Sequence, residues 1–314
     1  MSHMLDMTKG RAAIAYRNEV PWHGLGQQMP DTNDVDLWQK AAGLDYVVRR
    51  APVQFVSESG AHAFPSRHVL YRSDTDHPLS VVSDGYKVVQ PAQIMEFFRD
   101  IVELGGYQME TAGALSDGKR IWALAKASEG TAIGGKDIIR PYLLLATSYD
   151  ASMSTVAKFV CERVVCHNTI TVALGESGDT IRVHHGKDFN ADDVKRQLGL
   201  GAQSWEQFVV DMKVLANRSI DREAAEGLTL SLLPKPESVD PRQTQGYKRI
   251  MSLFEKGIGS ELTEGPSLWR WLNAVTQYTD WERGITVSSR MNSAWFGEGD
   301  ATKTKAMQIA LAAA

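Results

Sequence analysis

The stretch "GYQMETAGALSDGKRIWALAKA", Gly106 to Ala127, decides how the first part of the chain folds. Two extended segments flank the pair Asp117-Gly118, and an Asp-Gly pair is typical of tight β-hairpin turns. Ile121 and Leu124 suit a strand with one buried side. The stretch therefore predicts a central β-hairpin.

Outward from this hairpin, the neighbouring segments are mostly rich in β-branched and aromatic residues, which favours strands. The predicted strands are Asp45 to Val56, Ser66 to Ser73, Leu79 to Val89, Arg140 to Asp150, a segment that continues through Ser154 to Cys166, and "DTIRVHH", Asp179 to His185. One segment before the hairpin differs, because Ile94, Phe97, Phe98 and Ile101 recur at helical spacing. Gly105-Gly106 is expected to end that helix.

From Asp192 onwards the apolar spacing predicts helices almost throughout, with stripes that include Phe208 and Met212, then Ile250 and Phe254. The predicted fold class is α+β. A β-rich α+β core with the central hairpin is expected over residues 1–190. A mainly helical region follows over residues 191–314, with a Pro-rich hinge near 234–241.

The composition and the N-terminal sequence disfavour several classes of protein. The 314 residues are 43% hydrophobic and 23% charged, which is typical of a globular chain. The net charge is −4, and this balance disfavours tight non-specific binding of duplex DNA. The start of the chain lacks the apolar segment of a secretory signal, and two cysteines argue against a disulfide framework. We therefore expect a cytoplasmic location.

The stretch "KFVCERVVCHNTI", Lys158 to Ile170, raises the question of a metal or thiol site. Zinc needs four ligands, yet Cys161 and Cys166 are five residues apart and would point to opposite sides of a strand. Their apolar neighbours favour two buried cysteines. A metal site with His184 and His185, or a catalytic thiol, remains the less favoured alternative. No phosphate-binding motif is present, so we expect no enzyme, no cofactor and no metal.

Basic and aromatic residues predict a nucleic-acid site instead. The segment from Lys119 to Arg163 carries seven Lys/Arg against four Asp/Glu. Single-strand binders combine cations with aromatic stacking platforms. The predicted nucleic-acid-binding residues are Lys119, Arg120, Lys126, Arg140, Lys158, Arg163, Tyr142, Tyr149, Arg49 and Arg50. The alternative is a solvated strand face above aromatic core residues.

Four separated motifs carry a family resemblance. They are "VPWHGLG" (Val20 to Gly26), "TAGALSDGKRIWALAK" (Thr111 to Lys126), "TSYDASMSTVAKFVCERVVCHNTITVAL" (Thr147 to Leu174) and "LWRWLNAVTQYTDWERG" (Leu268 to Gly284). In this order they resemble the phage/plasmid-like family catalogued as a domain of unknown function (DUF 932). Within the third motif, Asn168 and Thr169 are predicted to close a strand and open a helix, and contact of Asn168 with a base or backbone is the alternative.

The family is remotely similar to the single-strand annealing recombinases of phages, an analogy at the level of fold. The resemblance implies a mobile-element protein that binds single-stranded DNA and promotes strand annealing without ATP or metal. It further implies a homo-oligomer, as a ring or filament. An accessory protein that binds a host protein is the alternative, and eight tryptophans would suit such contacts.

Overall fold

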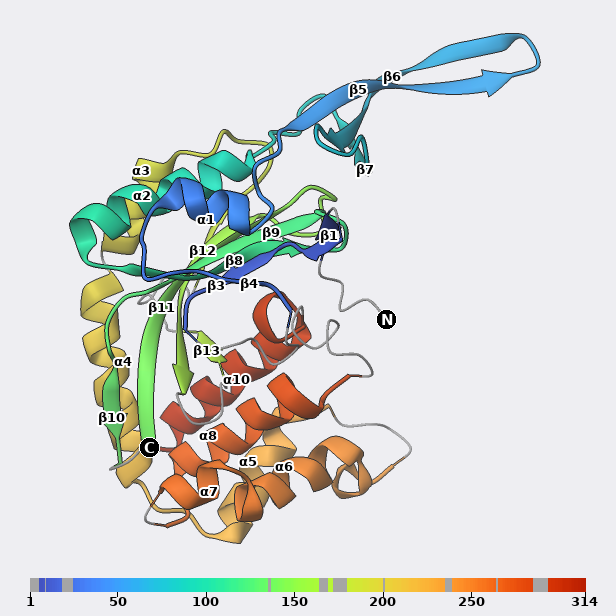
Figure 1. Ribbon diagram of the computed structural model, residues 1–314. Coiled ribbons are helices and arrows are strands. Elements are labelled where there is room, and N and C mark those ends of the chain that lie inside the picture. The colour runs from blue at the N-terminus through green and yellow to red at the C-terminus, as the bar shows by residue number, and fades with distance from the viewer. Residues whose placement is uncertain are drawn as a thin grey trace. The chain divides into compact units, whose positions relative to one another are not determined.

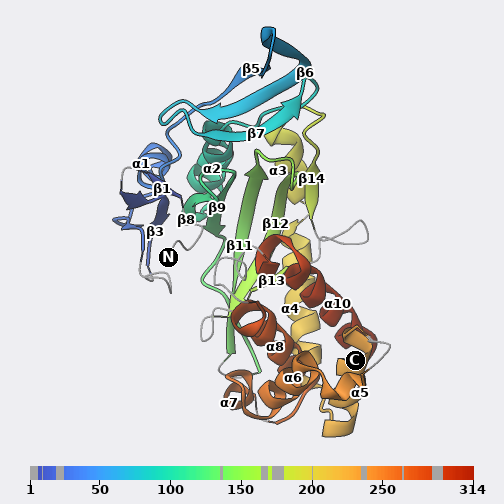
Figure 2. The same ribbon diagram turned by 90° about the vertical axis from the view of Figure 1, so that its right-hand side faces the viewer.

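The computed structural model describes residues 6–8, 10–18, 25–134, 137–163, 169–171, 180–199, 201–234, 239–263, 265–284 and 293–314. The chain forms two compact units, each assembled from separate stretches (Figures 1 and 2). Unit 1 comprises Met1–Ala127, Leu143–Lys158 and Thr180–Gly199, and unit 2 comprises Ser128–Tyr142, Phe159–Asp179 and Leu200–Ala314. The boundary predicted at residue 190 lies within the last stretch of unit 1.

The predicted α+β class is confirmed, because the N-terminal half is mostly strands and the C-terminal half mostly helices. Unit 1 holds β1 (Met7–Thr8), β2 (Arg11–Ala12), β3 (Ile14–Tyr16), β4 (Gln27–Gln28), α1 (Val35–Ala41), β5 (Val48–Ser57), β6 (Gly60–Arg72), β7 (Pro78–Ser83), α2 (Pro91–Gly105), β8 (Gln108–Leu115), β9 (Arg120–Lys126), β14 (Ile181–Val183) and α3 (Ala191–Gly199). Two long strands, β11 (Asp137–Ser148) and β12 (Thr155–Arg163), contribute residues to both units.

The predicted central hairpin is β8 and β9, which pair antiparallel from Gln108↔Lys126 to Leu115↔Arg120. Among the described strands, the large sheet has the order β13-β12-β11-β9-β8-β3-β4. Helix α2 packs on β8 and β9 and also contacts α1 (Figure 1). Its predicted stripe is buried at Ile94, Phe97 and Phe98. Gly106 follows the helix with a left-handed φ of 70°, a conformation that glycine adopts without strain.

A second sheet of unit 1 has the order β5-β6-β7. Strand β7 pairs only with Arg67 to Tyr71 of β6, whereas β5 and β6 continue past it and pair with each other out to Ser57↔Gly60. We call the antiparallel ribbon of β5 and β6, Val48–Arg72, the arm (Figure 1). Along its outer part, Gln54 to Ala63, no third strand of the described residues pairs with the ribbon.

Unit 2 is built mainly of helices. Its elements are β10 (Thr131–Ile133), β13 (Thr169–Thr171), α4 (Gly201–Asn217), α5 (Arg222–Leu232), the 3-10 helix η1 (Pro241–Gln243), α6 (Gln245–Lys256), α7 (Gly259–Leu262), α8 (Leu268–Gln277), the π-helix η2 (Tyr278–Glu282) and α10 (Glu298–Ala312). Helix α8 contacts α4, α6, α7 and α10 (Figure 2). Its residues from Leu268 to Thr276 are buried except Arg270, because neighbouring helices surround it.

The two buried indoles on α8 find partners inside unit 2. The indole of Trp269 donates to Asp137 Oδ2 at 2.7 Å, and the indole of Trp271 donates to Thr229 Oγ1 at 2.9 Å. Ser267 caps the helix by accepting from Arg270 N. Of the eight tryptophans that the sequence offered as contacts for a partner, Trp38, Trp122, Trp269 and Trp271 are buried core residues.

The helix predicted to open at Thr169 is wrong. Thr169–Thr171 form β13, which pairs antiparallel with Val160, Cys161 and Glu162 of β12. A segment of alternating Thr and Ile suits a strand, and the neighbouring edge of β12 supplies the backbone partners. Asn168 lies outside the described residues. In the predicted hinge, residues 235–238 also lie outside them, and Asp240 caps η1 by accepting from Arg242 N.

Candidate nucleic-acid interface

The turn of the central hairpin presents the first predicted cations. Ser116, Asp117 and Gly118 all have left-handed backbone, with φ of 54°, 58° and 87°, and Lys119 N donates to Ser116 O at 3.1 Å. A Cβ on Gly118 would lie 2.9 Å from Arg72 Nη1 and 3.2 Å from the Tyr46 hydroxyl, so glycine is required there. Lys119 and Arg120 follow this turn, and both residues are half-exposed.

Arg120 is joined to the loop between β11 and β12. Its Nη2 donates to Ser152 Oγ at 2.9 Å, and Ser152 N donates to Asp150 Oδ1 at 3.0 Å. The Ser152 hydroxyl also donates to Asp150. Burial alone would raise the pKa of the Asp150 carboxyl, but these hydrogen bonds and the charge of Arg120 lower the pKa below its usual range. The loop is therefore held by an ionised carboxylate at neutral pH.

The lowered pKa of the Asp150 carboxyl predicts a contribution to stability that is lost in acid. A depressed folded-state pKa gives stability that is present above the unfolded pKa of about 4 and is lost as pH falls through the folded value. We expect Asp150→Asn to lower the melting temperature at pH 7 and to have a smaller effect at pH 3. Thermal unfolding of both proteins at the two pH values checks this. An equal effect at both values would contradict it, and Asp188→Asn, at an exposed aspartate, is the control.

Two histidines line the same loop. The ring of His185 stacks on Tyr86 with centroids 4.4 Å apart, and its nitrogens lie 3.1 Å from Lys87 O and 3.0 Å from Met153 O. His184 Nδ1 lies 3.0 Å from Ser154 Oγ on the exposed side. These contacts explain both histidines through the packing of unit 1. Among the described residues, no three His, Cys, Asp or Glu side chains gather into a metal-binding group.

The arm carries exposed aromatic side chains that the sequence prediction missed. Phe55 pairs across the ribbon with His62, and their rings stack with centroids 5.3 Å apart at 27°. Phe55 and Phe64 are each about half exposed, at 50% and 49%. The His62 ring is positioned further by Ser57 and Ser59, whose hydroxyls each lie 2.9 Å from His62 Nε2. An exposed ring held in this way is a platform on which another planar group can stack.

Arginines lie where the arm begins. Arg49 and Arg50 of β5 are exposed, and so is Arg67 of β6. Arg50 also donates to Tyr86 O, which links β5 to the segment that follows β7. From Val48 to Arg72 the sequence has four arginines and one acidic residue, Glu58, at the tip. The arm is thus basic within a chain that is acidic overall.

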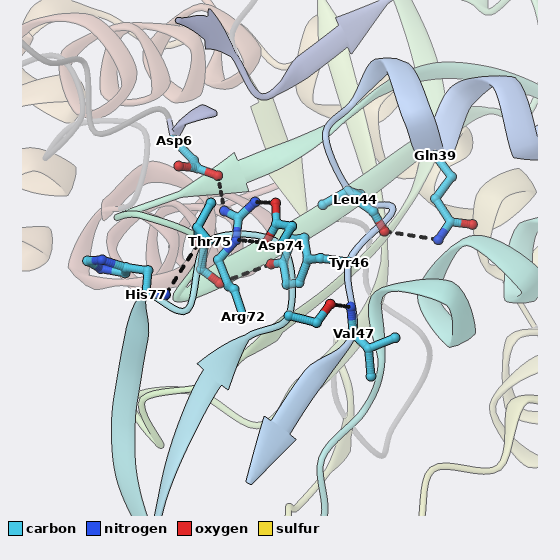
Figure 3. A network of polar contacts seen from close by, with 11 residues as sticks. Asp6, Gln39, Leu44, Tyr46, Val47, Arg72, Asp74, Thr75 and His77 are labelled. Atoms are coloured by element: carbon cyan, nitrogen blue, oxygen red, sulfur yellow. Dashed lines mark hydrogen bonds and ion pairs between the residues drawn. The ribbon is translucent and has the colours of Figure 1, made fainter. Parts of the chain in front are cut away.

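A buried network fixes the base of the arm (Figure 3). Arg72 is 1% exposed, bonds Asp6, and donates to Asp74 from Nε at 3.0 Å and from Nη2 at 2.8 Å. Its guanidinium lies 4.0 Å from the centre of the Tyr46 ring. The Tyr46 hydroxyl donates to Gly118 O at 3.4 Å, and burial raises the pKa of this phenol. The network thereby joins the end of β6 to the hairpin turn.

Six of the ten predicted binding residues have side chains at the surface. Arg49 and Arg50 are exposed, and Lys119, Arg120, Lys126 and Arg140 are partly exposed. Two of these residues, Arg49 and Arg50, belong to the arm. Lys119 and Arg120 belong to the hairpin turn, to which the base of the arm is bonded. Lys126 lies at the opposite end of β9, paired with Gln108, and Arg140 belongs to unit 2.

Three of the other four predicted binding residues are buried. Tyr142 and Lys158 are each 2% exposed and Tyr149 is fully buried, so these side chains do not face a ligand. Their β-branched and aromatic neighbours place them in the sheet's core, which a linear count of charges does not reveal. Arg163 ends β12, and its side chain lies outside the described residues. Cys161 is buried, as expected, and Cys166 is not described.

A local signal for the arm was present in the sequence. The segment "VQFVSESGAHAFPSR", Val53 to Arg67, places turn-forming residues between two apolar segments that each hold a phenylalanine. As one hairpin, this segment predicts the aromatic pair. The predicted strands that end at Val56 and begin at Ser66 do not include the tip.

Fold and site together define the class: an α+β protein with a two-stranded arm, whose base is bonded to a central hairpin. The chain belongs to the family described as "Domain of unknown function (DUF932)", whose model matches residues 78–308. The matched region includes the hairpin and the loop from Ser148 to Ser154, and it begins after the arm. No curated protein and no solved structure matches the chain. Within the described residues, no helix combines the length and apolar character needed to cross a bilayer.

Proposed function

We propose that unit 1 binds single-stranded DNA along the arm and promotes strand annealing. The observation that carries this proposal is the exposed Phe55–His62 stack on a ribbon whose beginning bears exposed arginines. Base-on-aromatic stacking tolerates any sequence because every base has a π-face, and cations beside the platform hold the phosphates. Stacking therefore favours an unpaired strand over a duplex, whose bases are already stacked.

The cations of the arm and those of the hairpin turn would contact different parts of the strand. Arg49, Arg50 and Arg67 would contact phosphates of nucleotides stacked on the arm, and Lys119 and Arg120 would extend this track at the hairpin turn. Tyr142, Tyr149 and Lys158 have no part in it because they are buried. The resemblance to annealing recombinases adds the annealing activity, the independence from ATP and metal, and the homo-oligomer, and the family resemblance adds the origin in a phage or plasmid.

The aromatic platform gives the first test. We expect the full chain to bind a fluorescent single-stranded oligonucleotide at low salt, with affinity falling as salt rises. Phe55→Ala combined with Phe64→Ala should weaken binding by about 10- to 100-fold, since stacking contributes about 1–3 kcal/mol per base and 1.4 kcal/mol is tenfold. Fluorescence anisotropy over a salt series measures both effects.

Val210→Ala is the matched control, because Val210 is an exposed apolar residue on α4, outside the arm. It should leave the affinity unchanged. Absence of binding at low salt would refute the proposal and favour the host-protein alternative. Equal affinity of the double variant and the parent would remove the arm from the interface.

Annealing is tested separately with two complementary labelled oligonucleotides. In a chelator and without ATP, the protein should speed the gain of energy transfer between the labels, and the Phe55/Phe64 double variant should do so less. Binding without faster annealing would restrict the function to protection or transport of single strands.

A further inference from the structure

The β5-β6-β7 sheet has two sides that differ in chemistry. Successive residues of a strand point to opposite sides, and directly paired residues share a side. One side holds Val48, Leu70 and Val82, which are all buried. We call the opposite side, which is at the surface, the outer face. Its residues are Arg49, Ala51, Val53, Phe55, His62, Arg67, Val69, Tyr71, Val81 and Ser83.

The outer face is continuous from the base of the arm to the Phe55–His62 stack. The pairing register shifts between Pro52↔His68 and Gln54↔Ala63, but β5 has only Val53 between these pairs. The alternation of sides therefore continues along β5, and Phe55 shares a side with Arg49. Six residues separate these two positions, which is about 20 Å at about 3.3 Å per residue.

A second aromatic residue lies at the base end of the outer face. Tyr71 of β6 pairs directly with Arg49 of β5 and is half-buried, so neighbouring residues hold it while part of it stays open. Between Tyr71 and the Phe55–His62 stack the face is apolar, and its Val81, on β7, is 58% exposed. Tyr71 is thus placed as a second stacking platform beside a cation.

The charge of the outer face has one sign. None of its residues is acidic. Within the described part of the chain, neither Arg49 nor Arg67 forms an ion pair or a hydrogen bond through its side chain, whereas Arg72 bonds two carboxylates. Both unpaired arginines are exposed and remain available to phosphates, with which arginine forms strong charge-assisted hydrogen bonds.

We propose that an unpaired strand crosses the whole outer face, with bases stacked on the Phe55–His62 pair and on Tyr71 and with phosphates held by Arg67 and Arg49. This inference rests on the proposed function and deepens it, because the site then includes β7 and has a defined length. At the 3.4 Å spacing of a stacked strand, about 20 Å corresponds to about six nucleotides. A polyanion is the favoured occupant, since the outer face of a second copy would bring arginine against arginine.

Charge reversal on β7 tests the extent of the site. Fluorescence anisotropy would use an oligothymidine of about ten nucleotides, within the usual range of single-strand sites. Val81→Asp should weaken binding by about tenfold and Val81→Lys should strengthen it, because like charges repel across an interface. Val56→Asp is the matched control, since Val56 is also an exposed valine but lies on the opposite side of the arm. Equal losses for the two aspartate variants would reduce the effect to net charge and overturn the proposal.

The second platform is tested by strand length. Tyr71→Ala should weaken binding of the longer oligothymidine by about tenfold, since stacking contributes about 1–3 kcal/mol per base. It should change little for a strand of about three nucleotides, roughly 10 Å when stacked, which cannot reach both platforms. Tyr71→Phe should bind as the parent does. Tyr107→Ala, at a half-buried tyrosine of unit 1 outside this sheet, is the control. Equal losses for long and short strands would contradict the proposal.

Failure of this inference is distinguishable from failure of the proposed function. A parent protein that binds no oligonucleotide refutes the proposed function and this inference with it. Weak binding by the Phe55/Phe64 double variant, with parent-like Val81→Asp and Tyr71→Ala, leaves the proposed function standing and overturns the longer site. If Val81→Asp keeps its binding but loses self-association in sedimentation velocity, the outer face belongs to a second copy, which also overturns the inference.

Discussion

Arg72→Met should destabilise the protein by about 3–5 kcal/mol, the usual cost of removing one partner from a buried ion pair. Arg72 is 1% exposed and bonds Asp6 and Asp74 at once. Methionine has a similar length but leaves both carboxylates without this cation, and the Asp6 side chain is only 9% exposed. It also removes the guanidinium that lies against Tyr46. Chemical denaturation followed by circular dichroism measures the loss.

Arg99→Met is the matched control, since Arg99 also pairs with two carboxylates, of Asp36 and Glu96, but at the surface. Exposed ion pairs contribute about 0–1 kcal/mol, so this variant should change stability little. Adding Asp6→Asn to Arg72→Met should recover part of the loss by removing one stranded charge. Equal effects of the two arginine variants would show that the buried network contributes no more than a surface pair.

Lys303→Met, in unit 2, should lower the free energy of unfolding by a similar amount, about 3–5 kcal/mol. Lys303 on α10 is 1% exposed and donates to Asp280 Oδ1 of the π-helix η2 at 2.7 Å. The Asp280 side chain is itself 8% exposed. Without the ammonium group the carboxylate remains buried with a large part of its charge uncompensated. The same denaturation experiment measures this effect.

Lys305→Met offers the same chemical change two residues further along α10, where the lysine is exposed and donates to Leu232 O. A cost of about 1 kcal/mol, the worth of one hydrogen bond, is expected there. Asp280→Asn combined with Lys303→Met should be more stable than Lys303→Met alone. If the combination were no better, the loss would come from packing of the lysine stem rather than from charge.

Most of the elements of this fold were predictable because local patterns determine them. The Asp117-Gly118 pair predicted the central hairpin, since Asp and Gly are among the few residues that tolerate the left-handed backbone of this turn. The helical spacing from Ile94 fixed α2 for a similar reason. The short strands β1 to β4 were not predicted, because two or three residues carry no readable period and pair only through distant partners.

The candidate site was predictable only in part. Basic residues beside an Asp-Gly turn pointed to Lys119 and Arg120, which are at the surface because a tight turn projects them outward. The same stretch of charge included Lys158, which is buried, since the local count cannot show which side of a strand faces the core. Phe55 and Phe64 were not predicted, because an aromatic residue in a strand usually belongs to the core.

The sequence by itself determined the α+β class, the central hairpin and the family, because these rest on turn chemistry, periodicity and ordered motifs. Only the tertiary structure decided that Arg72 is buried between two carboxylates while Arg49 and Arg67 are exposed, although all three are strand arginines. It likewise decided that the arm's aromatics face solvent. Burial depends on which segments pack over a strand, and for the outer arm no third described strand does so.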